Sequence, residues 1–286
     1  MSGRSLSPRI NALLAAVLFG AGTPFAKVLL GTVDPLVLAG LLYLGAGLGA
    51  ALLLAVRRGV SDVPLVPKLG ARERLALGGA VLAGGGAAPI LMMYGLRATP
   101  AGTASLLLNF EVVATTLIAA VAFHEAIGRR VWIAVTLVTT AACLLAWRPG
   151  EPWGLSVGVV GIIGACALWG LDNNLTRLVS TADPMTIVCV KGFGAGTIAF
   201  ALAAVVGAHV PAVRASVMAI ALGSISFGLS IALFVRALRD LGAARTGALF
   251  GTAPFVGALI SWAVLGETPD ATALVSLPLM ATGVFL

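Results

Sequence analysis

The sequence has 286 residues, of which 59% are hydrophobic and only 10% are charged, and its mean hydropathy is +1.07. A water-soluble domain cannot hide that much apolar surface, because its outer shell must face water, so the composition excludes a soluble protein. The net charge of +7 points to basic cytoplasmic loops rather than to nucleic-acid binding, since such loops set the orientation of membrane proteins.

Long apolar segments separated by Pro, Gly and charged residues predict ten transmembrane helices. In hydrocarbon every backbone polar group needs an internal partner, which leaves helices or closed barrels, and continuous rather than alternating apolar runs favour helices. The tenth segment is short for a span of about 20 residues, so we expect a truncated C-terminal end. In chain order the predicted helices cover residues 10–30, 35–56, 75–95, 102–123, 130–147, 155–175, 184–206, 215–235, 243–265 and the stretch from 272 onward.

The distribution of basic residues predicts that both termini are cytoplasmic. With the N-terminus inside, the inner segments hold far more Lys and Arg than the outer ones, as the positive-inside rule requires. We therefore expect a multi-pass protein of a bacterial-type cytoplasmic (inner) membrane. The inner residues are Arg4, Arg9, Arg57, Arg58, Lys68, Arg72, Arg74, Arg129, Arg130, Arg177, Arg236, Arg239 and Arg245, and the outer ones are Lys27, Arg97, Arg148 and Arg214.

The two halves of the chain resemble each other, which predicts two domains, residues 1–149 and 150–286. The second half repeats the order and nearly the spacing of the first, from Phe19-Gly20 against Trp169-Gly170 to Glu125 against Glu267. Each unit would contain five helices, so the second copy would enter the membrane from the opposite side. An all-helical membrane protein of two inverted five-helix repeats is an architecture of secondary transporters.

One element in each half carries a more specific resemblance. Residues Tyr94–Leu108, followed by Glu111 and Glu125, are similar to the closing signature of an EamA repeat, and the partner element ends in Ala253-Pro254 and Leu265-Gly266-Glu267. The chain therefore resembles the EamA family of the drug/metabolite transporter superfamily over essentially its full length. That resemblance implies ten helices, cytoplasmic termini and export or exchange of small metabolites. Val112 stands where the second repeat has Pro254, so we expect a straighter fourth helix.

Charged residues within the predicted helices are costly in lipid and therefore mark candidate functional positions. Lys191 and Asp172 should lie at similar depth on adjacent antiparallel helices, and pairing would offset much of their desolvation cost. The pair would either line a substrate cavity or lock two helices together. Asn173, in the same polar run as Asp172, is a third candidate, because an amide can donate and accept hydrogen bonds.

The predicted fourth helix carries Asn109 and Glu111 near its middle. Burial without a cation favours the neutral form of a carboxyl group, which makes Glu111 a candidate proton carrier as well as a substrate-binding residue. The alternative is a structural hydrogen bond to a neighbouring helix, or pairing with Lys191. Trp169, beside the polar run, is a candidate for stacking on a ligand. Glu125 and Glu267 end equivalent helices and are candidates for gate or helix-end hydrogen bonds.

These features favour a carrier over an enzyme or a channel. No catalytic triad, metal cluster or nucleotide-binding loop is visible, and Cys143, Cys166 and Cys189 lie in apolar runs without metal-ligand spacing. We expect no cofactor, no metal and no nucleic-acid partner; the expected partners are a small-molecule substrate, the bilayer and protons, with the protein a monomer or homodimer. We predict alternating-access export or exchange of a small polar or amphipathic metabolite, with an amino acid as first candidate. A sugar-phosphate or nucleotide-sugar exchanger, or a channel, is the alternative.

Overall fold

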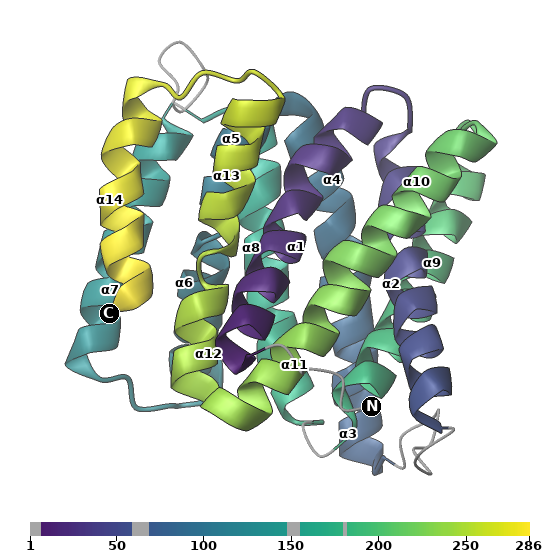
Figure 1. The fold of residues 1–286 in the computed structure, drawn as a ribbon, viewed down its shortest axis with the longest axis horizontal. Coiled ribbons are helices and arrows are strands. Elements are labelled where there is room, and N and C mark those ends of the chain that lie inside the picture. Colours follow the sequence, from purple (N-terminus) through teal and green to yellow (C-terminus); the bar gives the residue numbers. More distant parts are fainter. Residues whose placement is uncertain (1–6, 59–68, 148–154, 180–181) are drawn as a thin grey trace.

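The computed structural model describes residues 7–58, 69–147, 155–179 and 182–286, and this part of the chain is a bundle of helices running between two ends (Figure 1). The predicted helices are found, most of them within four residues of their expected ends. Four basic residues of the predicted charge asymmetry fall outside the described part of the structure: Arg4, Lys68 and Arg148, and the side chain of Arg58.

Nine helical stretches of the described chain are long and apolar enough to cross a membrane, and one further apolar helix is shorter. We call the end of the bundle where the first helix begins the lower end, and the opposite one the upper end, as they appear in Figure 1. In the first half the helices are α1 (Pro8–Leu29), α2 (Pro35–Arg58), α3 (Ala71–Ala80), the π-helical η1 (Val81–Ala87), α4 (Ala88–Ala98), α5 (Ala101–Leu107), α6 (Phe110–Ala122) and α7 (Arg129–Ala146).

The second half contains the same kinds of element in the same order. Its helices are α8 (Val157–Arg177), α9 (Pro184–Val205), α10 (Val213–Gly223), the π-helical η3 (Ser224–Leu229), α11 (Ser230–Leu241), α12 (Ala243–Phe250), α13 (Ala253–Val264) and α14 (Ala271–Phe285). Local signals explain several starts. Ser7, Ser156, Asp183 and Asp270 cap α1, α8, α9 and α14, each accepting a backbone N–H of the first turn.

Both halves interrupt the same two spans. The π-helical segments η1 and η3 divide one span in each half, and short breaks at Leu108–Asn109 and Gly251–Thr252 divide the next. The break in the first half occurs although Val112 replaces proline, so the absence of this proline does not make the fourth helix continuous. In Figure 1 the interrupted spans run in opposite directions: α5 lies above α6, whereas α12 lies below α13.

The helix ends that follow α6 and α13 are also alike. His124 and Gly266 both have positive φ, 53° and 70°. In each turn the N–H three residues beyond the end of the helix, on Glu125 or Glu267, donates to the carbonyl six residues earlier, Ala119 or Ser261, at 3.1 and 3.4 Å. A residue with positive φ just past the last turn is a common C-terminal cap. Two similar turns of this kind, each placing a glutamate just past a helix, are what a duplicated unit would produce.

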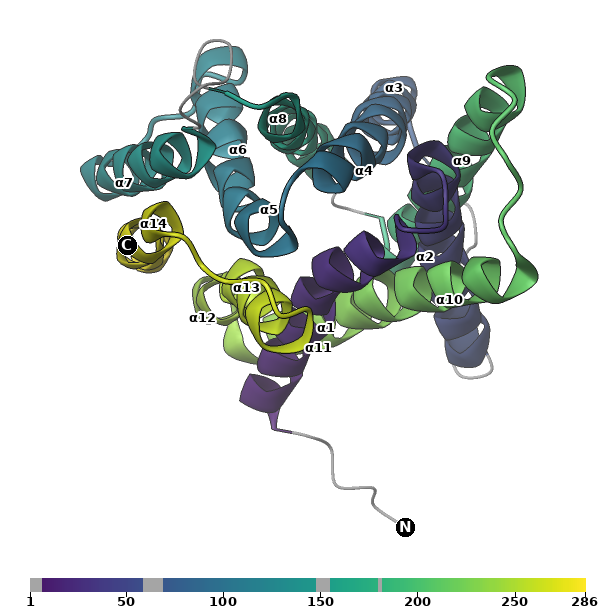
Figure 2. The ribbon, with the colours of Figure 1, turned by 90° about the horizontal axis from the view of Figure 1, so that it is seen from above.

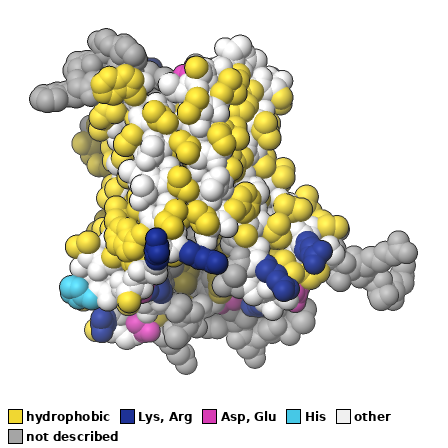
Figure 3. Space-filling view, turned by 90° about the vertical axis from the view of Figure 1, so that its left-hand side faces the viewer, with side chains coloured by type: hydrophobic (Ala, Val, Ile, Leu, Met, Phe, Trp, Pro, Cys, Tyr) yellow, Lys and Arg dark blue, Asp and Glu magenta, His cyan; other side chains and the backbone are white. Residues whose placement is uncertain are grey.

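Helices of the two halves pack against each other rather than within separate domains. α2 lies along α9, α8 contacts α4 and α6, α7 lies beside α14, and α1 contacts α11 and α13 (Figure 2). Leucine and alanine dominate the buried core. Large apolar side chains also cover the outside, and in the view of Figure 3 they occupy the middle and upper part while Lys and Arg gather toward the lower end. An apolar exterior of this kind suits lipid.

Glycine permits the closest of these helix contacts, and one position allows a clean test. A Cβ added to Gly45 on α2 would collide with the Ile220 carbonyl oxygen on α10, whereas one added to Gly78 meets nothing within 4 Å. We expect Gly45→Ala to lower the free energy of unfolding by about 1–3 kcal/mol, the usual cost of overpacking. Gly78→Ala should leave it unchanged or raise it, since alanine favours helix. Unfolding titrations of both purified variants would check this, and equal stabilities would contradict the packing.

Candidate functional site

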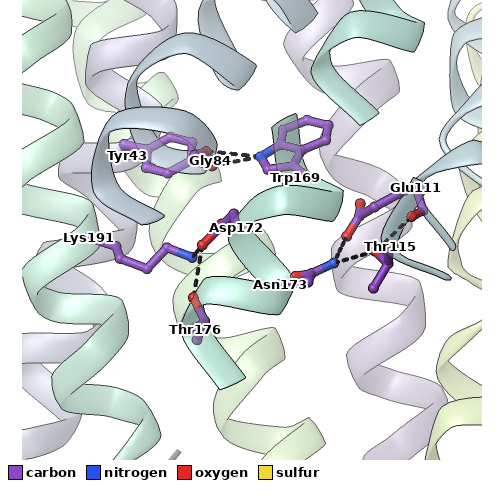
Figure 4. Close-up of polar contacts among 9 residues, drawn as sticks. All are labelled: Tyr43, Gly84, Glu111, Thr115, Trp169, Asp172, Asn173, Thr176 and Lys191. Atoms are coloured by element: carbon purple, nitrogen blue, oxygen red, sulfur yellow. Dashed lines mark hydrogen bonds and ion pairs between the residues drawn. The ribbon is translucent and has the colours of Figure 1, made fainter. Parts of the chain in front are cut away.

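Eight polar or aromatic side chains and the backbone of Gly84 come together among the helices, and we call this group of nine residues the polar cluster (Figure 4). Helix α8 supplies a polar stripe to it at positions i, i+3, i+4 and i+7, a spacing that puts side chains on one face of a helix. Helices α2, α6 and α9 and the π-helix η1 supply the rest. The members are Trp169, Asp172, Asn173 and Thr176 of the α8 stripe, with Tyr43, Gly84, Glu111, Thr115 and Lys191.

The first part of the cluster is a buried ion pair. Lys191 Nζ on α9 donates to both carboxylate oxygens of Asp172 on α8, at 2.5 and 2.7 Å, and Thr176 Oγ1 donates to the same carboxylate at 2.8 Å. The Lys191 side chain is only 19% exposed, and the Asp172 side chain is only 5% exposed. The pair predicted from sequence depth is therefore formed, and each charge compensates the other.

Gly84 on η1 lets this pair form at its observed depth. A Cβ at position 84 would fall on the Asp172 carboxylate, so the close approach of η1 to α8 requires glycine here. Gly84 is the first of three consecutive glycines, and small residues of this kind let helix backbones approach closely. The π-helical geometry is often found at functional sites because it leaves backbone groups without their usual partners.

The second part of the cluster joins α6 to α8 through an amide. Asn173 Nδ2 donates to Glu111 Oε1 at 2.8 Å and to Thr115 Oγ1 at 3.1 Å. The neighbouring Asn174 is buried and donates to the Thr115 carbonyl at 3.0 Å, which holds the two helices in register. Among the residues that the structure describes, no cation pairs with Glu111. The alternative in which Glu111 pairs with Lys191 is not found, because Lys191 is bonded to Asp172.

The third part of the cluster is aromatic. Trp169 Nε1 donates to the Gly84 carbonyl at 3.0 Å and to Tyr43 Oη at 3.3 Å, and Tyr43 Oη donates to the same carbonyl at 2.9 Å. The π-helix thus offers one carbonyl oxygen to two aromatic side chains. These bonds hold Trp169 one turn above Asn173 on α8.

From Tyr43 a path of aromatic rings continues into the second half. The ring centroids of Tyr43 and Phe227 are 6.1 Å apart, those of Phe227 and Phe19 are 5.5 Å apart, and Phe250 follows at 5.2 Å from Phe19. All four side chains are half-buried. Because they come from α1, α2, η3 and α12, the rings face a common interior of the bundle.

The structure brings together five of the six residues predicted to bind substrate: Glu111, Trp169, Asp172, Asn173 and Lys191. Asn109 lies elsewhere. It is buried at the break before α6, and its Nδ2 donates to the Leu106 carbonyl at 3.0 Å and to Met280 Sδ on α14 at 3.7 Å. Its hydrogen bonds therefore stabilise the interruption and its contact with α14.

Tyr43, Gly84, Thr115 and Thr176 were not predicted as members of the site. The sequence does contain a signal for Thr176, because this residue completes the polar stripe at positions i, i+3, i+4 and i+7 of α8. The signal for Tyr43 is weaker, namely that it is one of two tyrosines in the chain. The described residues contain no group of three or more His, Cys, Asp or Glu side chains that could hold a metal ion.

The upper end of the bundle is tied together by a basic and an acidic residue. Lys27 Nζ, in the last turn of α1, donates to the carbonyls of Leu96, Arg97 and Thr99 at the end of α4, at 2.7–3.0 Å. Glu267 accepts the N–H groups of Ala101 and Gly102 at the start of α5, at 2.7 and 2.8 Å. Each charge sits at the helix end that suits it, because helix N-termini attract anions and C-termini attract cations.

The lower end carries residues at the repeat-equivalent positions. Arg177, in the last turn of α8, forms an ion pair with Glu125, and its guanidinium lies 5.5 Å from the centre of the Phe123 ring. Both side chains of this pair are exposed. The predicted helix-end glutamates therefore differ in this structure: Glu267 binds backbone groups of another helix, whereas Glu125 pairs with an arginine.

Comparisons with known proteins agree with this membrane architecture. The model of the "EamA-like transporter family" matches residues 7–147 and again residues 156–286. A protein from Methanothermobacter thermautotrophicus described as an "uncharacterized transporter" is 27% identical, over 99% of this chain and 86% of its own length. A solved structure, described only as a protein crystal structure, superposes with a TM-score of 0.69 over 99% of this chain and 95% of its own; at 16% identity, that likeness concerns the fold alone.

Proposed function

The chain belongs to the EamA-like transporter family, and from this premise we propose that it is a secondary transporter that exports or exchanges a small polar or amphipathic metabolite, with an amino acid as first candidate. The observation that carries the proposal is the polar cluster. Four charged or amide side chains, Glu111, Asp172, Asn173 and Lys191, converge from three helices long and apolar enough to cross a membrane. Ionisable groups within such helices are expensive and mark substrate pathways.

The proposed mechanism is alternating access between two inverted five-helix repeats, residues 1–149 and 150–286. The opposite course of the interrupted spans and the matching caps before Glu125 and Glu267 support such a repeat. In this proposal Lys27 and Glu267 hold the upper gate closed, and Arg177 and Glu125 belong to the lower gate. A repeat unit inserted in both directions gives two related states of similar energy, open to opposite sides.

We propose that the lower end faces the cytoplasm of a bacterial-type inner membrane, with both termini on that side. The Lys and Arg side chains visible at the lower end in Figure 3 support this orientation. Arg9, Arg72 and Arg129 begin α1, α3 and α7 at that end. Basic residues next to membrane spans favour the cytoplasmic side.

The ion pair argues against a sugar-phosphate or nucleotide-sugar exchanger. A phosphate group would need two or more basic side chains at the depth of the cluster. Lys191 is already neutralised by Asp172, and Arg236, the second candidate cation, is exposed on α11. The cluster therefore offers a phosphate no uncompensated positive charge among the described residues, which favours a zwitterionic, cationic or neutral substrate.

Counterflow in proteoliposomes tests the proposal. Vesicles loaded with one unlabelled metabolite at a time, from a panel of amino acids, amines, sugars and sugar phosphates, should accumulate the labelled form of at least one. We expect Lys191→Ala and Glu111→Gln to abolish that flux, and Asp240→Asn, which removes an exposed carboxylate from the end of α11, to leave it unchanged. Wild-type flux in both site variants, or flux confined to sugar phosphates, would overturn the assignment. A proton gradient that leaves flux unchanged would exclude proton coupling.

A further inference from the structure

Resting on the proposed function, we infer that the transported substrate carries an ammonium group joined to an aromatic or apolar body. The ammonium would bind Glu111 beside Asn173 and Thr115, and the body would pack on Trp169 and the aromatic path. The charges, the hydrogen-bonding groups and the rings of the interior each point to this class of molecule.

The charge balance of the polar cluster favours a cation. Asp172 and Lys191 compensate each other at 2.5 Å, whereas among the described residues the Glu111 carboxylate receives a hydrogen bond only from a neutral amide. Other charged side chains belong to the two ends of the bundle, Lys27 and Glu267 to the upper end and Arg177 and Glu125 to the lower. An ionised Glu111 leaves the interior with one uncompensated negative charge. Such a charge attracts a cation and repels an anion.

The hydrogen-bonding groups around Glu111 suit a donor rather than an acceptor. One oxygen, Oε1, already accepts from Asn173, while the second has no bond to a described residue. The Thr115 hydroxyl donates its proton to the Glu111 carbonyl at 2.8 Å. Toward a ligand it can therefore act only as a hydrogen-bond acceptor. An ammonium group has donors and no acceptor, and it can meet both oxygens.

The aromatic rings explain why the substrate should be amphipathic. Trp169 lies one turn from Asn173 on the same face of α8, which puts the Cβ atoms of the two residues about 5–6 Å apart. Tyr43, Phe227 and Phe19 continue the apolar surface into the other half. Aromatic faces attract cations and also bury apolar groups, so an amine with an aromatic body gains from both.

Three ligands of equal size test the inference: phenethylamine, 2-phenylethanol and phenylacetate carry a cation, no charge and an anion on the same body. Tetramethylammonium supplies the charge without the body. Binding to purified protein in nanodiscs can be followed by tryptophan fluorescence and by calorimetry. We expect phenethylamine to bind at least about tenfold more tightly than each of the other three, a difference that corresponds to one well-placed charged contact.

Variants then locate the site. Glu111→Gln keeps the size of the side chain and the bond to Asn173, and should weaken phenethylamine binding by about tenfold or more. Glu111→Asp should retain most of the preference for the cation, Trp169→Leu should weaken binding several-fold, and Asp240→Asn should bind as the wild type does. Equal binding of the alcohol or the anion, or undiminished binding by a folded Glu111→Gln protein with a wild-type melting temperature, would overturn the inference.

Counterflow separates this inference from the proposed function. If the vesicles exchange a neutral or anionic solute and Glu111→Gln leaves amine binding unchanged, the protein is a transporter and the substrate class is wrong. If phenethylamine binds through Glu111 but no metabolite or amine is exchanged, the binding site stands and the transport function fails.

Discussion

Replacing Asp172 with Asn should destabilise the folded protein more than the loss of any exposed ion pair. The substitution leaves the Lys191 ammonium in the interior without its carboxylate. Removing one partner of a buried pair costs about 3–5 kcal/mol, and because the Lys191 side chain is 19% exposed we expect about 2–4 kcal/mol here. Lys191→Met should cost a similar amount, because it leaves Asp172 unpaired. Unfolding titrations in detergent would measure both.

The double variant Asp172→Asn/Lys191→Met decides between the two roles left open for this pair. With both charges gone, neither remains uncompensated, so the double variant should recover much of the stability lost in the single ones. The exposed pair at the lower end is the matched comparison, since Arg177→Met should cost at most about 1 kcal/mol. If the double variant is stable and still transports, the pair only locks α8 to α9. If it is stable but inactive, the charges serve the substrate.

The helical spans could be predicted from sequence because lipid imposes a simple requirement on each of them. An apolar run of sufficient length must become a helix, and caps such as Asp183-Pro184 fix where it starts. The pairing of Asp172 with Lys191 could also be predicted from the requirements of lipid, because two charges at equal depth on adjacent antiparallel helices have few other partners. Depth along a helix is readable from residue numbers once the ends are known.

Other features of the site depend on contacts between segments distant in sequence. The breaks at Leu108–Asn109 and Gly251–Thr252 contain no proline at the break itself, and the π-helical segments have no common residue pattern. Tyr43 joins the cluster because η1 turns the Gly84 carbonyl toward it, which no local signal encodes. Asn109 shows the converse: its position in the middle of a span suggested the cavity, but the helix break gives its amide other partners.

Glu267→Gln should open the upper end of the transporter. The carboxylate accepts two backbone N–H groups of α5, and hydrogen bonds to a charged acceptor contribute about 1.5–3 kcal/mol each. Glutamine presents one oxygen and one NH2 group to the same two donors, so one bond is lost and the charge with it. We expect the equilibrium to shift toward the upper-open state by about ten- to a hundredfold, since each 1.4 kcal/mol is a factor of ten.

Thr99 offers a reporter for this opening. Its side chain is buried at the end of α4, and its hydroxyl has no hydrogen-bond partner among the described residues, so Thr99→Cys should be tolerated. In a background with Cys143, Cys166 and Cys189 replaced, a charged, membrane-impermeant thiol reagent should modify this cysteine slowly in the otherwise unchanged protein. Glu267→Gln should accelerate the reaction by about tenfold or more, in proportion to the population shift.

Glu125→Gln is the internal control, because it alters the lower end in place of the upper one. If the two glutamates act on opposite gates, Glu125→Gln should leave the Thr99→Cys reaction unchanged or slow it, while the two substitutions together should bring the rate back toward that of the parent. Reciprocal effects of this kind follow only if both ends bias one equilibrium. Equal acceleration by both variants would mean that the two glutamates do not act on opposite gates, and that the gates are set by other contacts.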